Sequence, residues 1–288
     1  PGAAGPSADA LARSMAELLA KQFGSAVVVE NRAGSSGVLG ADAVAKSAPD
    51  GYTLLFAQQD SQTILPLLRK SMPYDTFKDF VPLAKVGDLY LIFASPAAKT
   101  NDLAQLVALA KANPGKLNYA SAGAGGINQL ATELLIQRTG MAMQSIPYKG
   151  GAPAAAALLA GEVDLFAGSY ALLGKNIEAG RLRGLGVTGP ARLPQLPNVP
   201  TMAELGYKDF VVSAWYGVLA PAGLPETLAT RLTGAILTAA NTPEYKARLA
   251  ATGAEGTPLD RAGFTRFIRE DYERWGEVIR KGGINLPD

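Results

Sequence analysis

Short apolar strands alternate with amphipathic helical segments through the first two thirds of this chain, and this alternation constrains its fold more than any other feature. β-Branched runs bounded by Gly, Pro or Asp predict strands, and periods of three to four residues predict helices. The predicted strands are residues 26–30, 52–57, 91–94, 117–120, 143–147, 163–166 and 185–188. The predicted helices are residues 11–24, 38–44, 101–111 with Asn101 as the cap, 127–139 and 152–160. This order is typical of an α/β protein with mainly parallel sheets flanked by helices.

The C-terminal third has helical periodicity. One apolar stripe consists of Leu228, Leu232, Ile236 and Leu237, and a second consists of Phe264, Phe267, Ile268, Trp275, Val278 and Ile279. The aromatic residues of the second stripe could line a ligand box, but spacings of three and four residues are typical of core packing. We expect this stripe to be core.

Length and charge limit the class of protein. A chain of 288 residues with 48% hydrophobic content buries one or two ordinary cores, and two domains are expected. Its net charge is +2, and no long block of like charge is present, which disfavours nucleic-acid binding. No apolar run reaches the roughly 18 residues that a membrane-spanning helix needs.

The chain has no Cys and no His, and this removes much catalytic chemistry. The usual zinc and copper sites, Cys nucleophiles and Ser-His triads are excluded. Residues 184–189 match the spacing GxGxxG, but the first two glycines lie in a predicted strand, and Pro190 and Pro194 prevent the helix that a dinucleotide site requires. We therefore expect no catalytic residue, metal or cofactor. A Lys- or carboxylate-dependent lyase on a similar scaffold remains the enzymatic alternative.

Three Gly- or Ser-rich turns precede predicted helices, at residues 2–8, 34–37 and 121–128. Unpaired N–H groups at a helix N-terminus can bind a carboxylate without Arg or Lys. The alternative is that these small residues only form tight turns and caps. Asp9 is expected to be a cap or a dipole partner, and Lys149 is expected to be solvated, with contact to a carboxylate as the alternative.

Several segments, taken in order, resemble the Bug-type solute-binding proteins of tripartite tricarboxylate transporters. The similarity extends over the whole chain and rests on the segments VVVENRAG (27–34), VAKSAPDGYTLL (44–55), KDFVP (78–82), PYKGGAPA (147–154), GEVD (161–164), RLPQLPNVPT (192–201), WYG (215–217) and APAG (220–223).

The resemblance implies a two-lobed Venus flytrap fold with two crossing strands. Residues 1–94 plus 216–288 would form one lobe, residues 95–215 the other, and the ligand cleft would lie between them. The implied function is periplasmic capture of a small organic carboxylate by a monomer that delivers it to integral-membrane permease subunits. A ligand-sensing module for a receptor is the alternative. Residues 1–5 show no secretory leader, so the leader is expected to be absent from this sequence, and the first strand is expected to lie before Pro1.

The family's binding loops match residues 5–9, 58–61, 121–129 and 168–170 of this chain. The ligand-binding residues that the resemblance implies are Gly5, Ser7, Ala8, Gln58, Asp60, Ser61, Ser121, Gly123, Gly125, Gly126, Ile127, Asn128, Gln129, Ser169 and Tyr170. Backbone N–H groups, with the Ser7, Ser121 and Asn128 side chains, would bind one carboxylate.

Some positions depart from the family pattern. Gln129 stands where a His is common, Gly126 where a Ser is common, and Gly168 and Ser169 stand where Asp-Asn is common. The missing Asp would have paired with a ligand ammonium group. We therefore expect a dicarboxylate or an aromatic carboxylate in preference to an amino acid.

Overall fold

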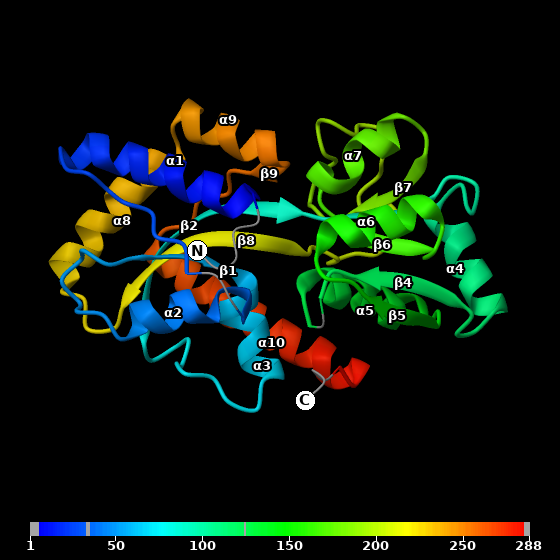
Figure 1. Ribbon diagram of the computed structural model, residues 1–288, viewed down its shortest axis with the longest axis horizontal. Coiled ribbons are helices and arrows are strands. Elements are labelled where there is room, and N and C mark those ends of the chain that lie inside the picture. Colours follow the sequence, from blue (N-terminus) through cyan, green and yellow to red (C-terminus); the bar gives the residue numbers. More distant parts are fainter. Residues whose placement is uncertain (1–5, 33–34, 124, 285–288) are drawn as a thin grey trace. The chain divides into compact units, whose positions relative to one another are not determined.

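The computed structural model describes residues 6–32, 35–123 and 125–284 (Figure 1). The chain forms two compact units. Unit 1 comprises Pro1–Asp88 and Ala214–Gly276, and unit 2 comprises Leu89–Ser213 and Glu277–Asp288. The divisions fall inside β2 (Phe80–Tyr90), β8 (Ser213–Pro221) and α10 (Arg261–Gly282), so these three elements contribute residues to both units.

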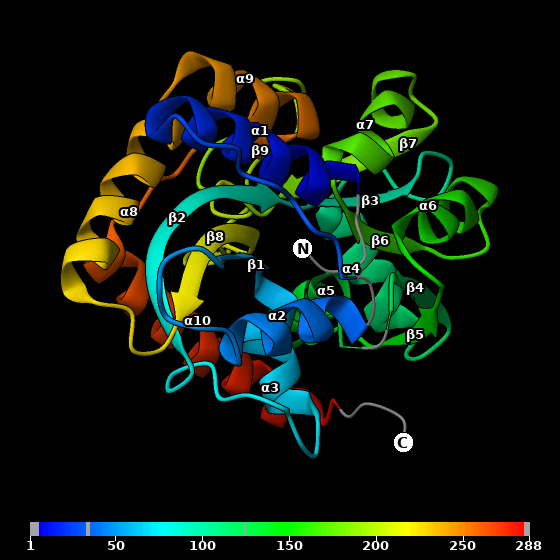
Figure 2. The same ribbon diagram turned by 60° about the vertical axis from the view of Figure 1, so that its left-hand side comes forward.

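Unit 1 is built on a four-stranded sheet with the order β1-β8-β2-β9. Its edge strands are β1 (Leu55–Gln58) and β9 (Ala254–Glu255), and β1 pairs antiparallel with β8. The helix α1 packs against α8 and α9 (Figure 2). The helical elements of this unit are α1 (Pro6–Phe23), η1 (Ser35–Gly37), α2 (Val38–Ala45), η2 (Asp60–Ile64), α3 (Leu65–Leu68), α8 (Glu226–Ala240), α9 (Pro243–Thr252) and most of α10.

Unit 2 is built on a five-stranded sheet with the order β5-β4-β6-β3-β7. The strand β4 pairs parallel with β5 and β6, whereas β3 pairs antiparallel with β6 and β7, so the sheet is mixed. The helices α6 and α7 pack together on one face, and α5 lies on the other (Figures 1 and 2). The elements are β3 (Ile92–Pro96), α4 (Leu103–Ala112), β4 (Leu117–Ser121), α5 (Ile127–Thr139), β5 (Met143–Pro147), α6 (Gly151–Ala160), β6 (Leu165–Gly168), α7 (Tyr170–Glu178) and β7 (Leu182–Val187).

The α/β class is confirmed, and most predicted elements are present within a few residues. The cap of α4 differs from the prediction. Asp102, not Asn101, is the N-cap, and its carboxylate accepts a 2.8 Å bond from the backbone N–H of Gln105. A charged acceptor at this position also interacts favourably with the helix dipole.

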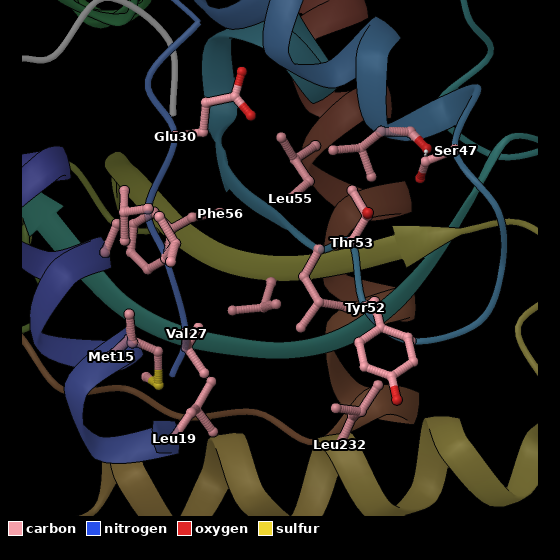
Figure 3. Close-up of a pocket in the computed structure, with 18 of the residues that line it drawn as sticks. Met15, Leu19, Val27, Glu30, Ser47, Tyr52, Thr53, Leu55, Phe56 and Leu232 are labelled. Atoms are coloured by element: carbon pink, nitrogen blue, oxygen red, sulfur yellow. Dashed lines mark hydrogen bonds between the residues drawn. The ribbon is translucent and has the colours of Figure 1, made fainter. Parts of the chain in front are cut away.

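The predicted strand at residues 26–30 is wrong, because this segment has no regular secondary structure. It faces a largely apolar cavity of about 830 Å³ in unit 1 (Figure 3). Met15, Leu19 and Phe56 are among the side chains that line the cavity, and Val28 is 85% exposed. A β-branched run forms a strand only where a neighbouring strand pairs with its backbone, and within the described residues none does so here.

The predicted core stripe of α10 is confirmed for every member except Phe267, which is only half-buried. In unit 1 the ring of Trp215 from β8 lies edge-on to Phe264, with 5.3 Å between the ring centroids. Two residues further along β8, a Cβ atom at Gly217 would lie 2.3 Å from Cζ of Phe264. Glycine is thus required for α10 to approach the sheet this closely.

Gly217→Ala is therefore expected to lower the free energy of unfolding by about 1–3 kcal/mol, because the added methyl group overpacks the interface between β8 and α10. The matched control is Gly234→Ala in α8, where no atom would lie within 4 Å of the new Cβ. That change should raise the free energy of unfolding by about 0.4–1 kcal/mol, because it restricts the unfolded chain. Urea unfolding of both variants measures the two effects, and equal shifts would contradict the packing described here.

Candidate functional site

Three parallel strands of unit 2 end at one edge of the sheet, and each is followed by a helix. The strand β4 leads into α5, β5 into α6, and β6 into α7. Since α5 and α7 lie on opposite faces, the loops after the neighbouring strands β4 and β6 diverge. Ligands of α/β proteins bind at such a point, outside the carboxyl ends of the strands. The helix N-termini also bring unpaired N–H groups and positive dipole ends to this edge.

The turn between β4 and α5 is folded by its own small residues. The Ser121 hydroxyl donates to the carbonyl of Gly123 over 2.6 Å, and the N–H of Gly125 donates to Oε1 of Gln129 over 2.8 Å. Gly123 and Gly125 have φ values of 144° and 74°, which favour glycine. Gly126 is the N-cap of α5. Because these three glycines have no side chains, an anion can approach the backbone of the turn closely.

Two further contacts join the neighbouring loops to this turn. Nδ2 of Asn128, in the first turn of α5, donates to the carbonyl of Ala167 near the end of β6, over 2.5 Å. The N–H of Tyr148, just after β5, donates to the carbonyl of Ser121 over 2.8 Å. The structure therefore brings one set of predicted residues to a single edge of unit 2, namely Ser121, Gly123, Gly125, Gly126, Ile127, Asn128, Gln129, Ser169 and Tyr170.

Ser169 and Tyr170 lie at this edge, and their side chains differ in their hydrogen bonds. Ser169 is the N-cap of α7, and its hydroxyl makes no capping bond. The ring of Tyr170 covers Gly174, and its hydroxyl donates to Glu178 over 2.6 Å. This hydrogen bond raises the pKa of Tyr170. The Tyr170 side chain is thus engaged along α7.

In unit 1, the predicted residues Gln58, Asp60 and Ser61 lie where β1 turns into η2. Gln58 is directly opposite Tyr216 of β8, and the Ser61 hydroxyl donates to the carbonyl of Gln58 over 3.2 Å. Burial, and then the nearby Asp60 carboxylate, raise the pKa of Tyr216 to about 12. Tyr216 therefore remains a neutral phenol across the physiological pH range.

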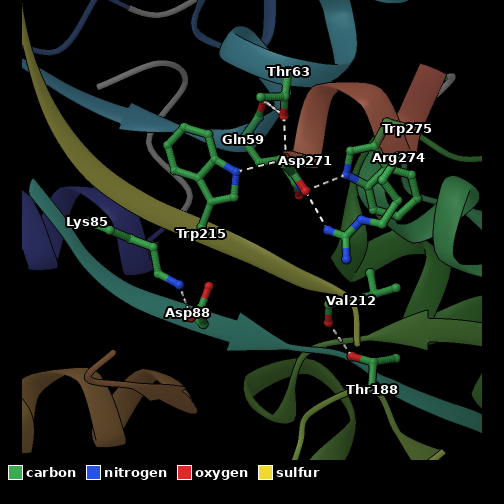
Figure 4. Close-up of polar contacts among 10 residues, drawn as sticks. All are labelled: Gln59, Thr63, Lys85, Asp88, Thr188, Val212, Trp215, Asp271, Arg274 and Trp275. Carbon is green, nitrogen blue, oxygen red and sulfur yellow. Dashed lines mark hydrogen bonds and ion pairs between the residues drawn. The ribbon is translucent and has the colours of Figure 1, made fainter. Parts of the chain in front are cut away.

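One residue that connects several elements at this corner of unit 1, Asp271, is not among the residues predicted from the sequence. Asp271 of α10 is 2% exposed, and its carboxylate accepts hydrogen bonds from Gln59, Thr63, Trp215, Trp275 and Arg274 (Figure 4). A signal was present, because Asp271 lies seven residues after Phe264 and four before Trp275, in the middle of the apolar stripe. A carboxylate on the core face of a helix requires buried donors.

The predicted residues at the start of the chain are described least. Gly5 lies outside the described residues, as does the side chain of Ser7. Ala8 is buried in α1, with 1% exposure. Asp9 accepts hydrogen bonds from Arg13 and from Asn31, and these lower its pKa, with the Arg13 contact having the larger effect. Asp9 therefore connects the first turn of α1 to the following loop, as expected of a structural residue.

Other candidate chemistry is sparse in the part of the chain that the structure describes. Lys149 is exposed. Among residues 6–32, 35–123 and 125–284, no group of three or more acidic side chains is arranged to bind a metal ion. Within the same ranges, none of the helices is long and apolar enough to span a bilayer.

Comparisons with known proteins agree with this architecture. Residues 11–284 match the sequence profile of the tripartite tricarboxylate transporter family receptor. Protein BugT of Bordetella pertussis is 40% identical over 287 residues, which cover 98% of this chain and 87% of BugT. The periplasmic binding protein BugD has a similar structure, with a TM-score of 0.80, 32% identity, and coverage of 98% of this chain and 95% of BugD.

Similar structures with a bound solute are also known. A protein of R. palustris solved with adipate superimposes with a TM-score of 0.80, at 31% identity, over 96% of this chain and 93% of that protein. The expected periplasmic-binding-protein fold is confirmed by these similarities. The family consists of transporter receptors and not of enzymes, which removes the lyase alternative. The chain belongs to the receptor family of the tripartite tricarboxylate transporters.

Proposed function

We propose that this receptor captures a small organic carboxylate outside the cytoplasm, with a dicarboxylate or an aromatic carboxylate preferred, and delivers it to membrane permease subunits. One observation carries the proposal: three helix N-termini and a glycine-rich turn share the carboxyl edge of β4, β5 and β6. Backbone N–H groups at such an edge bind a carboxylate without a positively charged side chain.

Both units are proposed to contribute to the same ligand. In unit 2 the turn at residues 121–129 would bind one carboxylate, and in unit 1 the segment at residues 58–61 would contact the ligand. The lobes in this proposal are residues 1–94 plus 216–288, and residues 95–215. A ligand that contacts both lobes only in one arrangement shifts the equilibrium toward that arrangement.

The preference against amino acids is proposed from the turn after β6. Gly168 and Ser169 supply no carboxylate there. Gly168 also has no room for a larger residue, because a Cβ atom would lie 2.7 Å from the Phe166 ring and 2.8 Å from Leu173. The adipate that is bound to the similar protein of R. palustris is a dicarboxylate with no ammonium group, which supports this choice of ligand.

A matched pair of solutes tests the ligand class. Glutarate and glutamate differ only in the ammonium group, so glutarate should raise the melting temperature by about 5 °C or more at saturating concentration, and glutamate should not. Adipate, malate and benzoate complete the panel of a thermal-shift experiment. Equal stabilisation by glutamate would refute the preference, and no shift with any of these acids would refute carboxylate binding.

An isosteric charge change tests the site in unit 2. Gln129→Glu retains the acceptor for the N–H of Gly125 and places a negative charge in the first turn of α5, where it suits the helix dipole. The melting temperature should therefore change little, because the interaction with the helix dipole offsets the repulsion from Glu133 one turn later. The affinity for a dicarboxylate should fall at least about tenfold, because like charges a few ångströms apart repel. Isothermal titration calorimetry measures the affinity.

Gln105→Glu is the control for this variant. Oε1 of Gln105 accepts a 3.0 Å bond from the N–H of Asn101, four residues earlier, as Gln129 does from Gly125. However, α4 follows β3, which is antiparallel to β6, so its N-terminus lies at the opposite edge of the same sheet. The control should bind with unchanged affinity. Equal losses in both variants would indicate a general effect of net charge and not a site at residues 121–129.

A further inference from the structure

We propose that Asp271 is a positioning residue, which fixes the segment at residues 58–64 in the form that binds the ligand. This inference rests on the proposed function, because Gln58, Asp60 and Ser61 are ligand contacts only there. Asp271 itself is almost fully buried and would not touch the ligand.

The Asp271 carboxylate binds the segment at two points. Nε2 of Gln59 lies 2.9 and 3.1 Å from the two carboxylate oxygens, and Oγ1 of Thr63 donates to Oδ2 over 2.7 Å. Asp60, Ser61 and Gln62 lie between these points. The position of the Asp271 carboxylate therefore determines the backbone conformation of residues 60–62.

The other side of the segment is fixed through its carbonyl groups. The hydroxyl of Tyr74 donates to the carbonyl of Ser61 over 2.6 Å, and that of Thr76 donates to the carbonyl of Gln62 over 2.8 Å. With Asp271, these bonds leave little freedom for residues 59–63. Asp60, which none of these bonds involves, is half-buried.

This support matters because residues 60–64 form a π-helix. A π-turn is wider than an α-turn, is rare, and occurs frequently at functional sites. The contacts of Gln59 and Thr63 with Asp271 span this wide turn. Without them we expect the segment to relax toward an ordinary helix, and Asp60 and Ser61 would then change direction.

The charge of Asp271 is needed, as well as its shape. Trp215 from β8 and Trp275 from α10 each donate their indole N–H to the same carboxylate, at 3.0 Å from Oδ2 and Oδ1. Arg274 forms an ion pair with it. An Asn side chain would offer one acceptor oxygen and would turn its own N–H groups toward these donors. With the amide nitrogen in place of Oδ2, Thr63 loses the acceptor for its hydroxyl, and Gln59 keeps only the 3.1 Å bond to Oδ1.

Asp271→Asn tests the proposal, with adipate and malate as probes in isothermal titration calorimetry. We expect an affinity loss of at least about tenfold and faster amide hydrogen exchange at residues 60–65. Thr63→Val is a milder second variant that removes a single bond, with an expected loss of a few fold. Leu249→Ala is the control, because it destabilises a buried position of α9 in the same unit and should leave the affinity unchanged.

A double variant tests whether Asp271 acts through the segment. If it does, Gln59→Met and Asp271→Asn together should cost much less affinity than the product of their separate losses. Asp271→Asn with wild-type affinity, or a fully multiplicative double variant, would overturn the positioning role while leaving the proposed function intact. A wild-type protein that binds neither probe would instead contradict the proposed function itself.

Discussion

The buried carboxylate of Asp271 is the interaction on which unit 1 depends most. It is the common acceptor for donors from the residue after β1, from η2, from β8 and from α10 itself. Removing a carboxylate from water costs several kcal/mol, and hydrogen bonds from all sides offset that cost. The apolar packing around the carboxylate joins the same two elements, β8 and α10. Trp215 lies edge-on to Phe264, and Gly217 allows α10 to lie close to β8.

Most of the fold could be predicted because local patterns determine its parts. The helix at residues 127–139 agrees in both bounds, since Gly126 before it and Gly140 after it are strong boundary signals. Residues 26–30 show where such reasoning fails. Their composition favours a strand, but a strand also requires a partner, and pairing is a property of the whole sheet. The strand β8 was not predicted for the same reason. It pairs with β1, and this pairing joins residues as distant in the sequence as Leu55 and Leu219.

For the candidate site in unit 2, the sequence predicts the turn between a strand and a helix but not the contacts within it. Glycines after a strand indicate a tight turn that leads into a helix, and residues 121–128 contain one. The side chain of Gln129 accepts from Gly125, and that of Asn128 donates to Ala167. Neither hydrogen bond can be predicted from the spacing of residues, because each depends on the three-dimensional positions of the two groups. Asp271 was missed for a different reason, because a single acid among many helical residues is usually a surface residue.

The position of the two indole groups has a consequence for spectroscopy. The chain contains two Trp residues, and both donate to the carboxylate of Asp271 in unit 1. Intrinsic tryptophan emission therefore originates from the surroundings of one buried anion, and unit 2 adds only tyrosine. A change in emission when a solute is added would report a rearrangement around the Asp271 carboxylate, to which Gln59 and Thr63 also donate.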